Sequence, residues 1–464
     1  MEYLQTDVFV EGFASMSTDT APDVAVPHLP PSSRLPRSVQ GALFIASRRR
    51  LFALMRRRHG VDYTVNVPMF GNAVVLGDTD LIRQLFLSGS DAVHNIRPNL
   101  GRVLGRASMF SLEGEEHRRQ RKLLTPPFHG RRMREYESII AEETLAEART
   151  WPSGSEFESL APMMRITLNA ILRAVFGAEG EELEVLRRHM PEWIEQGSRI
   201  SVLPKPPFDF PGSPWRRFHT NRRRFDDLVD TLVAKAQADP DFENRSDILS
   251  LMLRSRYDDG TALSRKEIAD QLLTMLAAGH ETTANTLAWA IERLTRHPDV
   301  LRRLYDEVDA GGSELRQAVI YEVQRSRPVI DLCGRTVTAE SLTLGEWTIP
   351  RGRVVLVSIA QVQADEALFP HADRFDPDRF LGSKPSTISW IPFGGGTRRC
   401  IGAAFANMEM DVVLRELLRH YAIEMTTAAD EAWHSRGVAF NPAKGGRVRL
   451  SPRGVASTGV ADVG

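Results

Sequence analysis

The run Phe393-Gly394-Gly395-Gly396-Thr397-Arg398-Arg399-Cys400-Ile401-Gly402 decides the fold of this 464-residue chain. Its three consecutive glycines allow a turn tight enough to bring backbone N–H groups to the cysteine sulfur. The segment that follows is predicted to be a helix that starts at the cysteine and points its positive end at the sulfur. Together these features favour a thiolate metal ligand, because nearby donors limit its basicity and its oxidation.

This string closely resembles the cysteine-loop signature of the cytochrome P450 family, in which a cysteine thiolate holds haem iron. The resemblance implies that Cys400 is the axial ligand of a haem b. The alternative, a buried structural cysteine, is disfavoured because a core cysteine needs neither three glycines nor two adjacent arginines. Four neighbours are implied in cofactor binding: Phe393 as a shield of the sulfur, Gly394 and Gly402 as points of close approach, and Arg398 as a partner of a haem propionate.

A second pattern, Ala278-Gly279-His280-Glu281-Thr282-Thr283, lies on a long helix predicted from about Ser264 to His297. The small pair Ala278-Gly279 opens room over a flat ligand, and Gly279 frees the backbone to bulge locally and admit water or dioxygen. In the family, the acid and alcohol of this pattern deliver protons during O2 reduction. By position, Glu281 and Thr282 therefore inherit a catalytic role.

Haem propionates require more cationic partners than Arg398. His117 and Arg121 are spaced i, i+4 on a helix that starts near Gly114, so both side chains point the same way. The resemblance implies that both contact propionates, and Arg335 matches a further propionate arginine.

Glu322 and Arg325 form an i, i+3 pair, which is usually a surface ion pair of a few tenths of a kcal/mol. Here the pair matches the Glu-x-x-Arg element of the family, and Arg374 matches the arginine that completes a buried triad. The resemblance implies that these three residues are structural and brace the loop that presents Cys400.

The rest of the chain predicts a mainly α fold with small β-sheets. This fold class agrees with the cytochrome P450 fold, in which haem lies between a long central helix and the cysteine loop. A β-hairpin is predicted at 62–76, strands at 335–338, 353–359 and 447–450, and a mostly helical pattern from about 79 to 325 with breaks that include Gly130 and 204–214. We expect a flexible lead at 1–35, one catalytic domain at 36–452 with a smaller β-rich lobe (about 36–78, 335–360 and 436–452), and a flexible tail at 453–464.

Composition excludes several classes of protein. Lys+Arg 59 against Asp+Glu 60 gives a formal net charge of -1 and no case for nucleic-acid binding. Only two cysteines exclude a disulfide framework or an iron–sulfur cluster held by this chain and suit the cytoplasm. The sequence predicts no signal peptide and no transmembrane segment. The basic segment 44–59 is predicted to be a solvated first helix, with a weak peripheral membrane contact as the open alternative.

Two further motifs are excluded. His280-Glu281 begins a zinc-protease motif, but that motif requires a histidine where this chain has Ala284. No strand–Gly-x-Gly-x-x-Gly–helix unit for NAD(P)H is present. Electrons are therefore expected from an external ferredoxin with its reductase.

By resemblance to bacterial, actinobacterial-type members, the chain is predicted to be a monooxygenase that inserts one oxygen atom of O2 into a hydrophobic small molecule. Fatty acids, sterols or terpenoids, and aromatic natural products all remain open as substrates. A non-catalytic haem-binding protein is the alternative class, and the pair Glu281–Thr282 argues against it. The pocket is expected to be lined by 93–110, Ala277-Ala278, Val329-Ile330 and Val438-Ala439-Phe440, and the ferredoxin to dock on Arg118, Arg119, Lys122, Arg399, Arg415 and Arg419.

Overall fold

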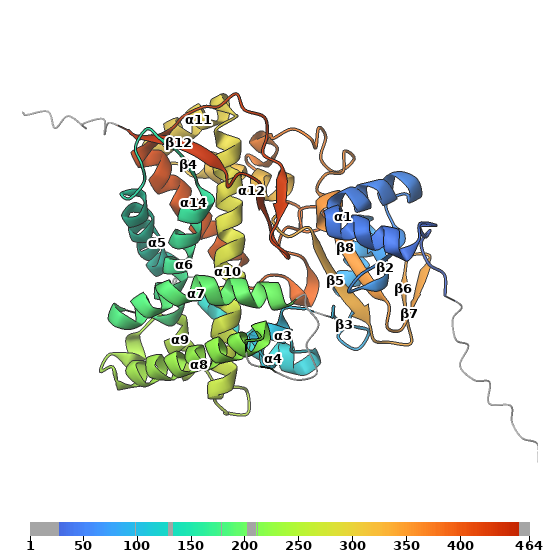
Figure 1. Cartoon of the computed structure of the whole chain (residues 1–464), viewed down its shortest axis with the longest axis horizontal. Helices are drawn as coiled ribbons and strands as arrows, with labels where there is room; N and C mark the ends of the chain where they lie inside the picture. Colours follow the sequence, from blue (N-terminus) through green and yellow to red (C-terminus); the bar gives the residue numbers. More distant parts are fainter. Residues whose placement is uncertain are drawn as a thin grey trace, which may run out of the picture.

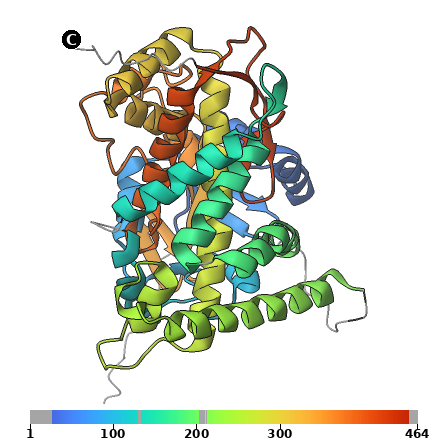
Figure 2. The ribbon, with the colours of Figure 1, turned by 90° about the vertical axis from the view of Figure 1, so that its left-hand side faces the viewer.

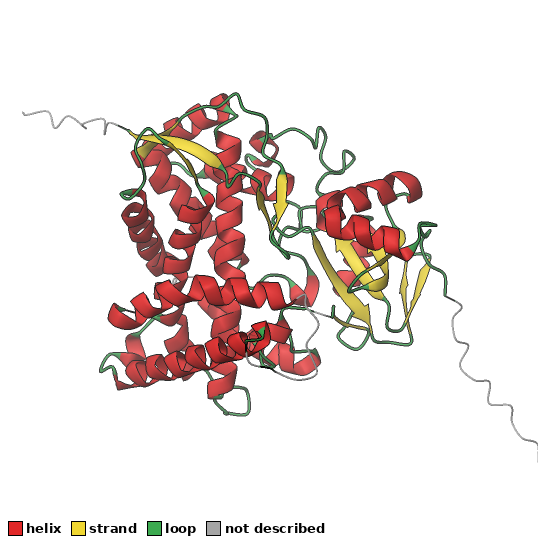
Figure 3. Ribbon diagram, viewed as in Figure 1, coloured by secondary structure: helices red, strands yellow, loops and turns green. Residues whose placement is uncertain are grey.

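The computed structural model describes residues 27–453 apart from 98, 129–132, 178, 202–209 and 211. Most helices gather on one side of the molecule, and a five-stranded sheet lies on the other (Figure 1, Figure 3). The predicted mainly α architecture with small sheets is confirmed. Most of the predicted lead, tail and break at 204–214, and the predicted break at Gly130, lie outside the described residues.

The helical side is built around α10 (Arg265–Leu294), which crosses the molecule (Figure 1). A capping box fixes its start, because the Ser264 hydroxyl accepts from the Glu267 N–H and the Glu267 carboxylate accepts from the Ser264 N–H. Helix α6 runs beside α10, and α5 lies across α14 (Figure 2). The other helices are α1 (Arg37–His59), α2 (Thr79–Leu87), α3 (Gly101–Leu104), α4 (Gly114–Leu124), α5 (Met133–Ala148), α6 (Leu160–Phe176), α7 (Gly180–Ser201), α8 (Pro214–Ala238), α9 (Ile248–Arg254), α11 (Pro298–Asp309), α12 (Glu314–Ser326), α13 (Ile359–Val362) and α14 (Ala403–His420), with 3-10 turns η1 (Pro126–Phe128), η3 (Phe242–Asn244), η4 (Pro377–Phe380) and η5 (Gly396–Arg398).

The large sheet has the strand order β1-β2-β8-β5-β3, in which only β2 and β8 are parallel. The predicted hairpin at 62–76 appears as β1 and β2, and the three predicted strands appear as β5, β8 and β12. Three smaller sheets pair β10 with β11, β6 with β7, and β12 with both β4 and β9. The strands are β1 (Tyr63–Val67), β2 (Gly71–Leu76), β3 (Val93–Asn95), β4 (Glu156–Glu158), β5 (Leu332–Val337), β6 (Ser341–Leu344), β7 (Trp347–Pro350), β8 (Val354–Ser358), β9 (Tyr421–Ile423), β10 (Trp433–Ser435), β11 (Phe440–Pro442) and β12 (Arg447–Pro452).

Helix α1 joins the two sides of the molecule. Its backbone leaves helical geometry at Ser47 (φ -166°, ψ 94°). After this kink, Arg48 and Arg49 contact the β10–β11 hairpin, where the Arg49 guanidinium lies 3.6 Å from the centre of the Trp433 ring. None of the helices in the described ranges is long and apolar enough to cross a membrane.

Candidate active site

Cys400 ends a loop that folds back on itself. Its backbone N–H donates to the Phe393 carbonyl at 2.9 Å. Glycine is required in this loop because Gly394 and Gly396 have φ values of 65° and 63°, which other residues rarely adopt. A Cβ atom on Gly395 or Gly396 would also overlap Phe86, the residue with which α2 packs against the loop.

Two opposing effects act on the Cys400 thiol. Desolvation by the surrounding protein raises its pKa, whereas the Gly402 backbone N–H and the charges of Arg121 and Arg399 lower it. The N–H that reaches the sulfur is thus that of Gly402, rather than the N–H groups of 394–396 that we expected. Helix α14 starts at Ala403 and not at the cysteine, and the N–H that faces the sulfur is that of its N-cap residue, Gly402.

The loop leaves space for a flat group beside the thiol. The Cys400 side chain is exposed to solvent in this structure. A Cβ atom on Gly402 would meet no other atom within 4 Å. The Phe393 ring is half-buried and packs edge-on against Trp390, with 5.8 Å between ring centres. Cys400 and Gly402 therefore fit the close approach of a porphyrin.

The four basic residues predicted to bind propionates come together beside the cysteine loop, with the three arginines around His117. His117 is buried, and its pKa falls to about 3 because of burial and because Arg398, Arg121 and Arg335 repel an added proton. The charge of Cys400 in turn favours the charged form of Arg121. Three cations beside a neutral histidine form a site for a ligand with more than one negative charge, and the two propionates of haem match this requirement.

Hydrogen bonds hold these arginines in place. The Arg121 guanidinium donates to the carbonyl of Arg399 at 2.7 Å, and that of Arg335 donates to the carbonyl of Gly395 at 3.0 Å. Both bonds tie the cations to the cysteine loop itself. The Arg398 guanidinium donates to the carbonyls of Met109 (2.9 Å) and Leu112 (2.6 Å) and pairs with the Glu113 carboxylate.

On α10, the hydroxyl of Thr282 donates to the carbonyl of Ala278 at 2.9 Å. With its hydrogen committed in this way, the hydroxyl oxygen is left as an acceptor. The local bulge expected at Gly279 is not present, because α10 runs unbroken from 265 to 294. The missing Cβ serves packing instead, since a Cβ atom on Gly279 would lie 2.6 Å from Cδ1 of Ile171 on α6.

Glu281 forms an ion pair that sequence reasoning missed. Its Oε1 lies 3.3 Å from Nε of Arg436, in the turn between β10 and β11. Burial raises the pKa of Glu281, whereas the charge and hydrogen bonding of Arg436 lower it. The two residues are 155 positions apart, and no local pattern links them.

Two of the three residues of the predicted structural triad form the expected buried contact, and the third does not. Glu322 and Arg325 are buried and form a two-point ion pair with two N–O distances of 2.7 Å. Arg374, however, is exposed and contributes only its carbonyl, which accepts from Arg325 at 3.0 Å. The second cation on Glu322 is Arg379, whose Nε lies 3.2 Å from the carboxylate.

The 3-10 turn η4 determines which of the two arginines, Arg374 or Arg379, reaches Glu322. Both Arg374 and Arg379 precede a phenylalanine, so the sequence offers two equivalent candidates. Pro377 begins η4, and this turn packs on α12 and carries Arg379 toward Glu322. Helix α12 in turn supports the cysteine loop, because the Trp390 indole N–H donates to the Tyr321 carbonyl at 3.1 Å.

The segments expected to line a substrate pocket meet in two groups. Ala277 packs with Leu100 and Phe110 against a buried cluster that includes Leu104 and Trp215. In the second group, the Phe440 N–H donates to the Val329 carbonyl at 2.9 Å. Apolar side chains predominate in both groups.

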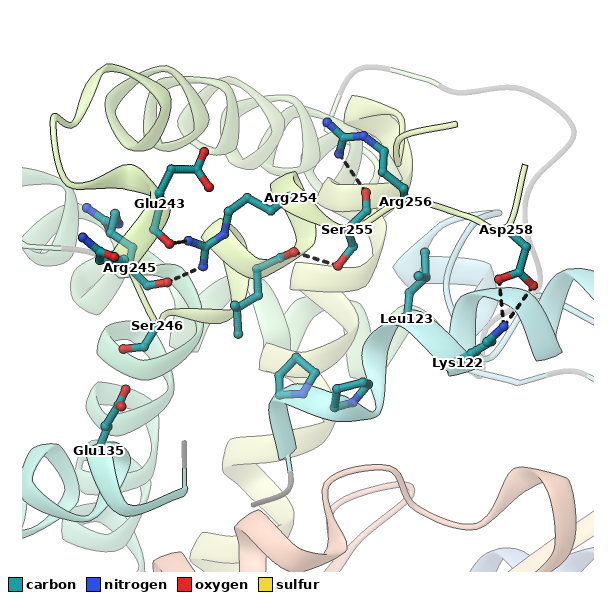
Figure 4. A pocket seen from close by; sticks show the side chains of 14 residues that line it. Lys122, Leu123, Glu135, Glu243, Arg245, Ser246, Arg254, Ser255, Arg256 and Asp258 are labelled. Atoms are coloured by element: carbon teal, nitrogen blue, oxygen red, sulfur yellow. Dashed lines mark hydrogen bonds and ion pairs between the residues drawn. The ribbon is translucent and has the colours of Figure 1, made fainter. Parts of the chain in front are cut away.

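The predicted basic docking surface is not one patch. Helix α4 carries its cations in ion pairs, and Figure 4 shows the Lys122–Asp258 pair at the edge of a surface hollow of about 710 Å³. Arg415 and Arg419 lie on α14 roughly 18 and 24 Å from the start of that helix, given 1.5 Å per residue. They are therefore remote from the cysteine loop. The α4 pairs are Arg118–Glu115, Arg119–Asp259 (2.7 Å) and Lys122–Asp258 (2.8 Å).

Comparison with known proteins adds independent evidence. Residues 30–445 match the family model described as Cytochrome P450. The chain is 57% identical over 434 residues to cytochrome P450 138 of Mycobacterium tuberculosis, covering 93% of this chain and 98% of the relative. It is 37% identical over 443 residues to cytochrome P450 135B1 of the same species, covering 93% and 94%.

Two solved structures have the same fold. A retinoic acid-bound cyanobacterial CYP120A1 superposes with a TM-score of 0.80 at 22% identity, covering 92% of this chain and 100% of the other. The heme domain of cytochrome P450DA superposes with a TM-score of 0.81 at 22% identity, covering 93% and 98%. At this identity the likeness concerns the fold alone.

Proposed function

Since this chain belongs to the cytochrome P450 family and is a haem-dependent monooxygenase, we propose that it inserts one oxygen atom of O2 into an apolar small molecule, with electrons from a separate ferredoxin. The observation that carries the proposal is the gathering of three arginines around a neutral histidine beside the loop that presents Cys400, since Arg121 and Arg335 both donate to carbonyls of that loop. When bound there, haem supplies the iron at which O2 is reduced.

The side chains of the cysteine side bind and orient the haem. Cys400 would ligate the iron as a thiolate, and Arg121, Arg335 and Arg398 would neutralise the propionates. His117, whose pKa is lowered by burial and by these three arginines, would add a hydrogen bond to a propionate. The absorption spectrum of the reduced, CO-bound protein tests this assignment, because its position reports thiolate ligation. A spectrum without the thiolate band would contradict it.

The Thr282 and Glu281 side chains of α10 take part in proton transfer. The Thr282 hydroxyl oxygen, fixed as an acceptor by its bond to Ala278, orders a proton donor at the distal side. Glu281 is the carboxyl group beside it that gains and loses a proton. This assignment rests on the contacts of Thr282 with Ala278 and of Glu281 with Arg436, and on the family pattern.

Thr282→Ala is expected to lower the product formed per NADPH at least about tenfold and to raise peroxide, since a positioned proton-transfer group contributes roughly 10²–10⁴-fold. Substrate binding and haem reduction should be unchanged. Both ratios are measured with a surrogate ferredoxin system. Thr286→Ala is the matched control, because the Thr286 hydroxyl makes the same i−4 bond to a carbonyl one turn further along α10. An unchanged ratio in Thr282→Ala would mean that Glu281 or water alone suffices.

We propose a hydrophobic substrate. The apolar cluster around Ala277 and the Val329–Phe440 contact support an apolar pocket wall. A fatty acid, a sterol or terpenoid, and an aromatic natural product all satisfy this chemistry. Screening such compounds for a shift of the haem absorption distinguishes them, and a preference for strongly polar compounds would contradict the proposal.

The proposed electron donor is a ferredoxin with its reductase, and the proposed location is the cytoplasm, which suits two free cysteines. The donor docks on the cysteine side, where α4 lies next to the loop through the Arg121–Arg399 bond. Arg118 and Lys122 form the outward face of α4, because they are spaced i, i+4 and both are mostly exposed. Their exposed ion pairs hold them only weakly.

Reversing both charges, in Arg118→Glu with Lys122→Glu, is expected to slow the second-order rate of reduction by the ferredoxin at least tenfold at low salt and to flatten its salt dependence. Stopped-flow reduction measures both effects. Arg415→Glu with Arg419→Glu is the matched control, since it changes the charge equally at the far end of α14. Equal slowing in the two variants would indicate a general charge effect and no docking surface at α4.

A further inference from the structure

The turn between β10 and β11 is held by one hydrogen bond of its own and by bonds to two other segments. The Arg436 N–H closes it by donating to the Ala439 carbonyl at 2.9 Å. The Arg48 guanidinium, on α1, donates to the carbonyls of Gly437 (2.8 Å) and Val438 (2.9 Å). The Phe440 N–H donates to Val329, which leads out of α12. These bonds connect the turn to α1 and to the segment that follows α12.

Arg48 is itself anchored. Its Nε lies 3.0 and 2.9 Å from the two oxygens of the Asp331 carboxylate, of which only 3% of the side chain is exposed. A guanidinium shared between a buried carboxylate and two carbonyls resists displacement, because moving it would leave the carboxylate without a partner. Arg48 thus fixes the Gly437–Val438 end of the turn to α1.

Arg436 extends from this turn to α10. Its Nε lies 3.3 Å from Oε1 of Glu281, and this is the one ion pair of Glu281 within the described ranges. The carboxylate is 20% exposed and the guanidinium 41% exposed, so the pair is partly desolvated. Glu195 on α7 faces Glu281 with like charge and opposes its ionisation. Burial and Glu195 both raise the pKa of Glu281, and Arg436 is the group that lowers it.

We propose that Arg436 is a positioning residue that holds the Glu281 carboxylate toward the β10–β11 turn and so links the place of the substrate to proton delivery. The link follows from geometry, because Val438, Ala439 and Phe440 share the hairpin with Arg436 and belong to the expected pocket wall. A substrate that presses on the turn changes the Arg436–Glu281 distance, and with it the ease of protonating Glu281. The inference rests on the proposed role of Glu281.

The test follows the protonation of Glu281 in the haem-loaded enzyme. The carbonyl band of the protonated carboxyl group is recorded by infrared spectroscopy against pH and is assigned by its loss in Glu281→Gln. Arg436→Gln is expected to raise the pH midpoint of this band by at least about one unit, since an opposite charge within 4–6 Å lowers a carboxyl pKa by about 1–3 units. Arg436→Lys should restore most of the wild-type midpoint.

Arg447→Gln is the matched control. Arg447 also lies on the C-terminal strands and forms an ion pair at 3.3 Å, with Glu156, far along the chain from Glu281. This variant should leave the midpoint of the Glu281 band unchanged. A midpoint that moves equally in Arg436→Gln and Arg447→Gln would overturn the inference, as would one that moves in neither.

The link to the substrate side is tested with 4-phenylimidazole, whose nitrogen binds haem iron and whose phenyl ring occupies the space above it. Binding of this probe is expected to shift the Glu281 midpoint in the wild-type enzyme and in Arg436→Lys, but not in Arg436→Gln. If the probe leaves the midpoint of the Glu281 band unchanged in the wild-type enzyme, the link is overturned.

Activity separates this inference from the proposed function. If Glu281→Gln leaves the product formed per NADPH unchanged, the proposed role of Glu281 fails. If Glu281→Gln lowers that ratio while Arg436→Gln changes neither the infrared midpoint nor the pH profile of the ratio, the role of Glu281 stands and that of Arg436 is overturned.

Discussion

Cys400→Ser is expected to reduce monooxygenation to background while the chain stays folded and haem binding is retained in part. A serine hydroxyl is neutral at physiological pH and cannot donate electron density to iron as a thiolate does. The fold should tolerate the change, because the loop is closed by the backbone bond from Cys400 to Phe393 and the side chain is exposed. The loss is measured as product formed per unit time and as loss of the thiolate band of the reduced CO complex.

Cys333→Ser provides the control for this experiment. Cys333 lies on β5, and burial raises the pKa of its thiol to about 11, so that it stays a neutral thiol. Its replacement should change neither the CO spectrum nor the rate of product formation. Wild-type product formation in Cys400→Ser would overturn the assignment of the axial ligand.

The sequence was most informative where the chemistry is local. The cysteine loop is one contiguous string, and the Glu322–Arg325 pair is one helical turn, so the contact within each is predictable from spacing, whereas the structural role of the pair was implied by the family resemblance. The cluster of His117 with three arginines was predictable only through the family resemblance. Its members lie on different elements, and nothing in their local sequence distinguishes them from surface charges.

Features that depend on tertiary contacts were missed. Gly279 suggested a helix bulge, but the reason for glycine at this position is packing, because the Ile171 side chain of α6 leaves no room for a Cβ atom. Arg374 was predicted and Arg379 was missed, because the packing of η4 on α12 is not visible in the sequence. The β6–β7 hairpin was also missed, although it is a local feature; its strands are only four residues long. In the cases of Gly279 and Arg374, the deciding neighbour is distant in sequence.

Glu409 is a further residue whose environment depends on tertiary contacts, and its burial lowers the stability of the folded protein. It lies on α14, is fully buried, and neither of its carboxyl oxygens has a hydrogen-bond partner within the described part of the chain. Burial raises the pKa of Glu409 to about 8, and the neighbouring Thr283 hydroxyl counters this only in part. The carboxyl group is therefore protonated at pH 7 in the folded protein.

The sign of the pH dependence follows from this raised pKa. Between the ordinary glutamate value near 4.5 and about 8, the folded state keeps a proton that the unfolded state has lost. Stability therefore falls as pH rises through this window and is constant on either side of it. At 1.36 kcal/mol per pKa unit, the penalty is roughly 3 kcal/mol at pH 7 and below about 1 kcal/mol at pH 5.

Glu409→Leu is expected to stabilise the protein by roughly 3 kcal/mol at pH 7, because the penalty for the buried carboxyl group is removed. The gain should fall below about 1 kcal/mol near pH 5 and grow toward pH 8, as measured by urea unfolding across this range. Glu409→Gln should remove the same pH dependence. Glu416→Gln, two turns along the same helix, should give no gain, since Glu416 is paired with Arg415 at 3.0 Å. A stability difference between Glu409→Leu and wild type that does not change with pH would show that Glu409 is ionised in the folded protein.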